Sequence, residues 1–205
     1  FISNGLNQLN PRQASAYRQP LTLVEEGFRP SNLLHLSQAI SQRWELEGFY
    51  QLSRATDVTE NCSTFFSQPD YVAQGCSDNL AVLRTRQQVL AQYGQPALDT
   101  LQGLGVNWNT PDEGGLVRRG EDQQASESGQ FGLALHYFAE ALDTHFGLYA
   151  VHVHSRQAYL GIRAPDQPTY SAAQVEGALA PLVVAGNSQY FMGYPQDQRT
   201  YALSF

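Results

Sequence analysis

Lysine is absent from this chain of 205 residues, and all 12 of its basic side chains are arginines. The absence excludes sites that depend on a lysine amine: phosphate-binding loops of the G-x-x-x-x-G-K type, Schiff-base catalysis, and kinase or Ser-x-x-Lys acyl-enzyme chemistry. The arginines are scattered, with Arg118 and Arg119 as the only adjacent pair, and the net charge is −7. Because nucleic acids and anionic membranes are bound through clustered basic groups, we expect neither as a partner.

Long apolar runs are also missing. No window approaches the 18 or more apolar residues that a membrane-spanning helix needs, so we expect no membrane insertion within the chain. Charged residues make up only 15% of the sequence, and Gln, Asn, Ser, Thr and Gly carry the polarity instead. The length is sufficient for a full core, which predicts one domain over residues 1–205. The first residue is Phe1 rather than Met, so we expect that an upstream segment has been removed.

Cysteine is scarce, with Cys62 and Cys76 as the only two, in a segment rich in Ser, Gln, Asn and Gly. Without a neighbouring histidine they do not make a zinc site. Free cysteines are usually buried, whereas these two flank a polar loop. We therefore predict a disulfide rather than two free thiols, and with it an oxidising, extracytoplasmic location that is periplasmic, cell-surface or secreted.

The spacing of apolar residues predicts helices in the first two thirds of the chain. Pro11 and Pro20 interrupt residues 1–29, and Pro30 follows them. We therefore predict that residues 1–29 form an extended N-terminal segment. Leu33, Leu36, Ile40 and Trp44 recur at helical spacing, and similar patterns begin at Ser77 and at Phe131. Between the last two helices, residues 107–130 are polar and rich in glycine, which predicts a long mobile loop.

After Gly147 the apolar period changes from helical to twofold. Strands are predicted at residues 148–154, 158–163, 189–194 and 200–205, with the first two as a hairpin and a short helix from Ser171 to about Ala180. The resulting fold class is α+β, with N-terminal helices packed against a mainly antiparallel four-stranded C-terminal sheet.

His152 and His154 form the sharpest motif, because alternate residues of a strand point to the same face and can reach one metal ion. His136 and Glu140, four residues apart on the predicted preceding helix, would complete a zinc site, or Glu140 would act as a base on a bound water. The alternative is that His152 and His154 lie on the solvent-exposed face of an antiparallel sheet, where histidines need no function. His136 and Glu140 lie opposite the apolar stripe, which is the solvated side of a helix.

Tyrosine is abundant in the last 60 residues. Tyr149, Tyr159, Tyr190 and Tyr194 are candidate binding residues, because a tyrosine offers apolar area and a hydroxyl at low entropic cost. The alternative is that one aromatic face is core beneath the helices.

No nucleophile motif such as G-x-S-x-G is present. We therefore expect an extracytoplasmic binding or assembly domain that recognises a protein, a glycan or a small ligand, without catalysis and without a cofactor. Two alternatives stay open: a zinc-dependent hydrolase that uses His152 and His154, and a secreted toxin or effector.

Overall fold

A computed structural model of the chain describes residues 10–20, 23–67, 69–174 and 176–205. The 205 residues, which we expected to form one domain, group into two compact units. Unit 1 consists of Phe1–Val58, Gln124–Ala158 and Tyr194–Phe205, and unit 2 consists of Thr59–Gln123 and Tyr159–Gly193. Each unit has its own sheet.

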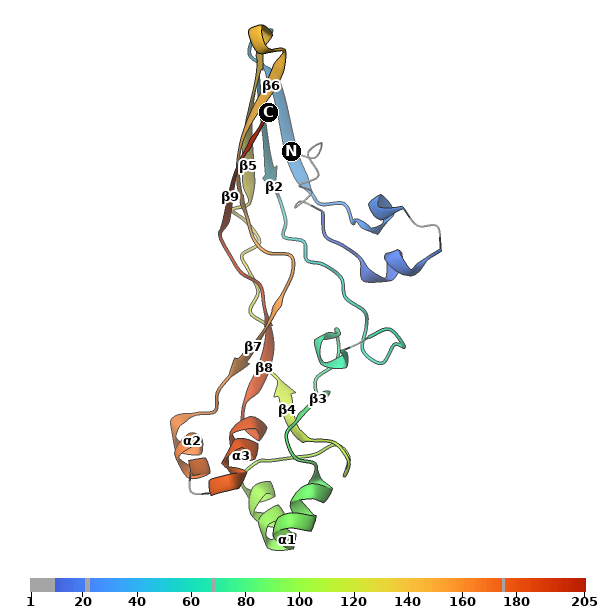
Figure 1. Cartoon of the computed structure of the whole chain (residues 1–205), viewed down its shortest axis with the longest axis vertical. Coiled ribbons are helices and arrows are strands. Elements are labelled where there is room, and N and C mark those ends of the chain that lie inside the picture. Colours follow the sequence, from blue (N-terminus) through green and yellow to red (C-terminus); the bar gives the residue numbers. More distant parts are fainter. Residues whose placement is uncertain (1–9, 21–22, 68, 175) are drawn as a thin grey trace. The chain divides into compact units, whose positions relative to one another are not determined.

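The sheet of unit 1 is entirely antiparallel and has five strands (Figure 1). In spatial order they are β1 (Leu33–Ala39), β2 (Trp44–Gln51), β5 (Phe131–Ala139), β6 (Thr144–Val153) and β9 (Gln198–Ser204).

A tight turn joins β1 to β2. The backbone N–H of Ile40 donates to the Trp44 carbonyl at 2.9 Å, and the Ser41 hydroxyl accepts from the N–H groups of Arg43 and Trp44. Further along, Gly132 lies where a Cβ atom would come within 2.3 Å of the Phe49 ring, so this strand position leaves the space that the buried ring fills.

The sheet of unit 2 is mixed and has four strands. In spatial order they are β3 (Leu80–Val82), β4 (Gly115–Arg119), β8 (Gln189–Gly193) and β7 (Tyr159–Arg163). β4 and β8 run parallel, whereas the other two pairs are antiparallel.

Three helices cover the core of unit 2: α1 (Arg86–Gly103), α2 (Gln167–Gln174) and α3 (Ala180–Gly186). α1 begins at a capping box in which Thr85 and Gln88 satisfy each other's backbone N–H groups. Gly94, with φ of 78°, kinks it. The core consists of eight buried side chains, which are Val89, Leu98, Leu101, Val106, Ala173, Leu179, Leu182 and Val183.

Short 3-10 helices lie at Ala14–Arg18, Val24–Gly27, Asp70–Val72, Glu140–Leu142 and Gly177–Leu179. The predicted disulfide is confirmed: Cys62 and Cys76 are bonded, with their Cα atoms 5.2 Å apart. Residues 107–130 include β4, and their mobility stays a prediction. Among the described residues, no helix combines the length and the apolar character that crossing a membrane requires.

The predicted fold class is wrong, because the chain is mostly β with two sheets rather than N-terminal helices on one four-stranded sheet. The helix expected after Pro30 is the β1–β2 hairpin, and the helix expected from Phe131 is β5. Apolar residues in both segments fit helical and twofold spacing alike, and pairing with distant strands decided between them.

The strands predicted after Gly147 exist, but their pairing differs from the prediction. The expected hairpin is split, since β6 pairs with β5 and β9 whereas β7 pairs with β8. β8 and β9 likewise belong to different sheets. The chain therefore leaves unit 1 after β6, forms β7 to β8 in unit 2, and returns to unit 1 for β9.

Candidate functional site

The five-stranded sheet has one apolar face, which the strand register arranges in four rows across the sheet. The first row is aromatic and contains Trp44, Tyr137 and Phe146. The second row contains Gln38 at the β1 edge and then four leucines, Leu46, Leu135, Leu148 and Leu203. The third row contains Leu36, Leu133, Ala150 and Tyr201. The fourth row contains Leu34, Tyr50, Phe131, His152 and Arg199. We call this surface the apolar face.

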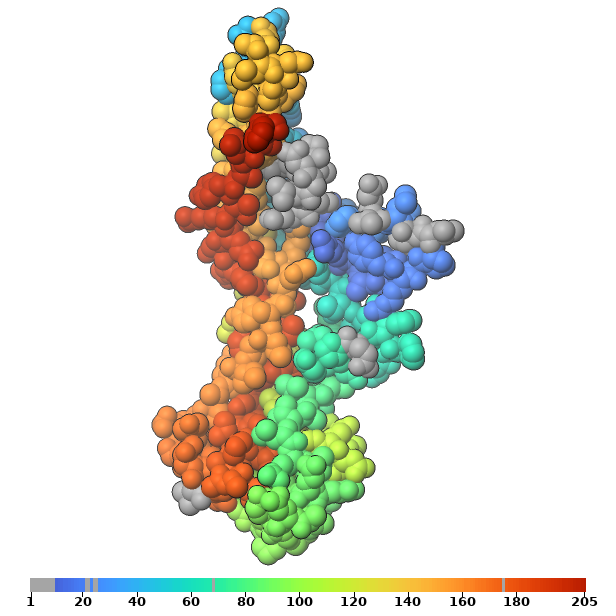
Figure 2. Space-filling view, viewed as in Figure 1, coloured from blue at the N-terminus to red at the C-terminus, as the bar shows by residue number. Residues whose placement is uncertain are grey.

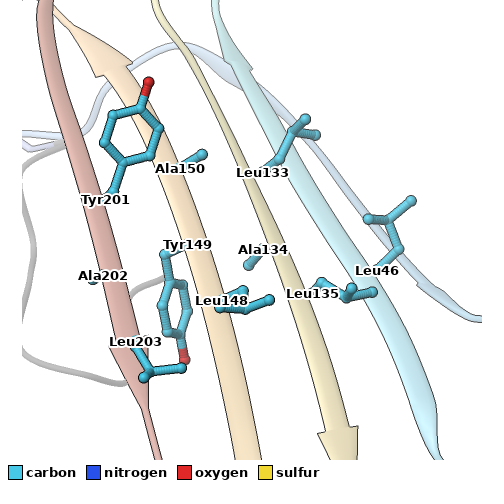
Figure 3. A pocket seen from close by; sticks show the side chains of 10 residues that line it. All are labelled: Leu46, Leu133, Ala134, Leu135, Leu148, Tyr149, Ala150, Tyr201, Ala202 and Leu203. Carbon is cyan, nitrogen blue, oxygen red and sulfur yellow. The ribbon is translucent and has the colours of Figure 1, made fainter.

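The apolar face is open to solvent. The exposed fraction is 66% for Leu36, 54% for Leu133, 56% for Leu148 and 74% for Tyr201. Figure 3 shows Leu46, Leu135 and Leu148 side by side across β2, β5 and β6, and the space above them is an open hollow of about 660 Å³. In the space-filling view the atoms of β9 lie at the surface beside those of β6 (Figure 2). Soluble monomers rarely expose a contiguous apolar patch of this extent.

The opposite face of the same sheet is polar, and its groups bond to one another. The Glu47 carboxylate lies 2.8 Å from His35 Nε2 and 3.4 Å from His136 Nε2. Burial alone would raise the pKa of Glu47, but the net shift of the pKa is downward, and the hydrogen bond with His35 is the largest of the causes that lower it. The Tyr149 hydroxyl is 3.1 Å from Ser204 Oγ. We call this surface the polar face.

Unit 1 buries few of its own apolar residues. Its buried cluster consists of Phe49 and Val153, with Leu33 and Val151 packed against them, and none of the four is in the four rows. Unit 2, by contrast, buries eight apolar side chains in one cluster. The strands of unit 1 therefore place their leucines where no other described part of the unit covers them.

Comparison with known proteins assigns the chain to a family. Residues 1–205 match the family model described as protein of unknown function (DUF1302). The chain belongs to the DUF1302 family. No curated protein and no solved structure matches it. The function of this DUF1302 chain must therefore be argued from its own residues.

The structure brings together only two of the four residues proposed as metal ligands. The rings of His152 and His154 lie 6.1 Å apart at the end of β6. His136 is on the polar face beside Glu47, and Glu140 forms an ion pair with Arg43 at 2.7 Å. In the described part of the chain, no group of three His, Cys, Asp or Glu side chains is arranged to hold a metal ion. These positions give the zinc-dependent hydrolase no support.

Both ring nitrogens of His154 are hydrogen-bonded. Its Nδ1 accepts from the Asp197 backbone N–H at 3.1 Å, and its Nε2 donates to the Ser128 carbonyl at 3.1 Å. Because an N–H can only donate and a carbonyl can only accept, the tautomer is fixed and both ring nitrogens are used. His152 donates from Nδ1 to the Gly129 carbonyl at 2.8 Å, and its Nε2 lies 3.3 Å from Asp197 Oδ1.

The four tyrosines proposed as binding residues are divided between the units. In unit 1, Tyr149 is on the polar face, and the Arg54 guanidinium lies 5.3 Å from the ring centre of Tyr194. In unit 2, Tyr159 is half exposed, whereas Tyr190 is fully buried against Tyr71. Tyr190 is therefore a core residue, and a binding role stays a prediction for the other three.

Tyr190 also gives a stability prediction. Its hydroxyl is buried and has no hydrogen-bond partner among the described residues, and burial raises its pKa. Tyr190→Phe removes an unsatisfied polar group without changing the ring, so we expect the free energy of unfolding to rise by up to about 1 kcal/mol. Guanidinium denaturation measures this, with Tyr159→Phe as the exposed control. A loss of stability in Tyr190→Phe would contradict the expectation.

Proposed function

We propose that this DUF1302 chain is a non-catalytic, extracytoplasmic binding domain whose apolar face binds the hydrocarbon region of a lipid surface. The observation that carries the proposal is the solvent-open apolar face of five paired strands, in which one row of leucines runs unbroken across β2, β5, β6 and β9. The Cys62–Cys76 disulfide supports the extracytoplasmic location, because such bonds persist in oxidising compartments.

The order of the rows favours lipid over a protein partner. Aromatic rings border the two central rows: the ring centroids of Trp44 and Tyr137 lie 4.5 Å apart on one side, and those of Phe131 and His152 lie 5.3 Å apart on the other. The six steps along β5 from Phe131 to Tyr137 separate the two aromatic rows by about 20 Å. Sheet surfaces that contact lipid carry an apolar band with aromatic rows at its borders, since the rings suit the boundary between hydrocarbon and water.

Polar groups lie within one of the aromatic rows and immediately beyond the other. Arg43 and Glu140 pair at the turns next to the Trp44 row, and His152 and Arg199 stand in the fourth row. The second and third rows, in contrast, contain no charged side chain. A protein interface normally includes about one hydrogen bond per 100–200 Å², whereas the only polar side chains in these central rows are those of Gln38 and Tyr201. Acyl chains need none.

Flotation of the full chain with phosphatidylcholine vesicles tests this proposal. Neutral vesicles are the appropriate probe because the chain carries a net charge of −7. We expect the wild-type chain to float with the vesicles. Leu133→Gln/Leu148→Gln should weaken binding by about tenfold or more, because burying each leucine contributes about 1.5–3 kcal/mol.

The matched control is Leu160→Gln/Ile162→Gln, which changes two exposed apolar residues of β7 in the other sheet. It should leave flotation unchanged, and thermal melts should show that both double variants remain folded. The proposal would be overturned if the wild-type chain remained at the bottom of the gradient and did not float with the vesicles. Self-association that Leu133→Gln/Leu148→Gln abolishes would also overturn it, since the occupant of the face would then be a second copy of the chain.

A further inference from the structure

Three arginines that are far apart in the sequence line one hollow in unit 1. Arg12 comes from the N-terminal segment, Arg156 follows β6, and Arg199 lies in β9. The hollow has a volume of about 610 Å³, within the range of small-molecule sites. Asp57 is the one carboxylate in its lining.

Backbone contacts fix the walls of this hollow. Asp57 Oδ1 accepts from the backbone N–H of Arg12 at 2.7 Å, and the Asp57 N–H donates to the Arg156 carbonyl at 3.1 Å. The Val58 N–H donates to the Arg12 carbonyl at 2.8 Å. His154 also lines the hollow, and both of its ring nitrogens are already hydrogen-bonded. The site is therefore built by contacts that do not use the guanidinium groups of Arg12 and Arg199.

The lining carries an excess of positive charge in a chain that is acidic as a whole. Three arginines and one aspartate line the hollow, so two positive charges have no matching carboxylate in the lining. Arg156 Nη1 donates to the Asn10 carbonyl at 3.3 Å, whereas Nε and Nη2 have no hydrogen-bond partner among the described residues. Burial, with Arg12 nearby, lowers the pKa of Arg156 to about 10, although Asp57 opposes the shift. Buried N–H groups normally have a hydrogen-bond acceptor, so Nε and Nη2 of Arg156 are two donors that a bound anion would complete.

We propose that this hollow binds a phosphate group, held by Arg12, Arg156 and Arg199. A phosphate monoester carries nearly two negative charges at neutral pH and three acceptor oxygens, which match the two uncompensated charges and the forked donors of arginine. The phosphate belongs either to a small soluble molecule or to a lipid headgroup. The inference does not depend on the apolar face binding lipid.

Calorimetric titration of the full chain with inorganic phosphate at constant ionic strength tests the site. We expect saturable binding by the wild-type chain at millimolar phosphate or below. Arg199→Gln should weaken it by about tenfold or more, and because Arg199 is exposed, the variant should fold. Arg156→Gln should abolish binding, and Arg118→Gln, an exposed arginine of β4 in unit 2, should not change it.

Two further arms identify the source of the phosphate. The first outcome is that glycerol phosphate binds with the affinity of inorganic phosphate and phosphatidic acid does not change flotation. This outcome assigns the site to a soluble molecule. Phosphatidic acid that strengthens flotation of the wild type but not of Arg199→Gln assigns it to a lipid headgroup. The absence of saturable phosphate binding, or equal affinities for Arg199→Gln and Arg118→Gln, overturns the site. Flotation with phosphatidylcholine alone tests the apolar face independently of these results.

Discussion

Leu101→Ala will lower the free energy of unfolding of unit 2 by about 2–5 kcal/mol. Leu101 is fully buried in the cluster beneath α1, with Leu98, Leu182 and Val183. Shortening it removes apolar contacts and leaves a cavity that its helical surroundings fill only in part, which is why the loss exceeds the transfer free energy of the deleted carbons.

Leu133→Ala is the matched control, because it is the same substitution on the apolar face of unit 1. Leu133 is 54% exposed, so we expect a change within about 0.5 kcal/mol. The contrast distinguishes a leucine that stabilises the fold from one that is available to a ligand. A loss of several kcal/mol in Leu133→Ala would mean that the apolar face is covered by the chain itself.

Each unit has one tryptophan, which makes the measurement specific. Trp108 packs against the core of unit 2 and donates from its indole N–H to the Arg84 carbonyl at 3.1 Å. Trp44 is in the first row of the apolar face of unit 1. Guanidinium denaturation followed by Trp108 fluorescence in a Trp44→Phe background therefore reports on unit 2 alone. Leu101→Ala should shift that transition to lower denaturant concentration.

Local features of the fold could be predicted from the sequence, whereas features that depend on distant pairing could not. The disulfide closes a short polar loop, and both cysteines are visible in the sequence. The strands after Gly147 follow from their twofold period, but the sheet that each one joins depends on partners far away in the chain. Because β7 and β8 pair within unit 2, β6 pairs with β9 rather than with β7, the strand that follows it in sequence.

The apolar face illustrates the same limit. Phe131, Leu133, Leu135 and Tyr137 alternate with Gly132, Ala134 and His136, which is a strand pattern. Phe131, Leu135, Phe138 and Leu142 fit a helix equally well, and their spacing predicts a helix from Phe131. What decides between them is the register with β2 and β6, which aligns leucines from separate segments into rows. Arg12, Arg156 and Arg199 were missed for the same reason, since only the fold brings them together.

Arg119→Met is expected to destabilise unit 2 by about 2–3 kcal/mol. The Arg119 guanidinium is largely buried and donates from Nη1 to the Ala73 carbonyl at 2.9 Å, within the disulfide loop. Its Nη2 donates to Asp122 Oδ2 at 2.8 Å, and Asp122 Oδ1 accepts from the Met192 N–H of β8 at 3.0 Å. One side chain thus joins the Cys62–Cys76 loop to the mixed sheet. Methionine fills a similar volume, but it cannot donate the arginine's hydrogen bonds to the Asp122 carboxylate and the Ala73 carbonyl. Removing one partner of a buried ion pair is strongly destabilising, because the other partner loses its compensating charge.

The neighbouring Arg118→Met provides the control, because Arg118 is exposed on the same strand. It should change stability by less than about 0.5 kcal/mol. Adding Asp122→Asn to Arg119→Met should recover part of the loss, because the amide keeps an acceptor for Met192 and removes the unpaired charge. The double-mutant cycle, measured through Trp108 as above, should therefore be non-additive. Additive losses would show that Arg119 and Asp122 act separately, and that the disulfide loop is held to the sheet by its backbone contacts rather than by this pair.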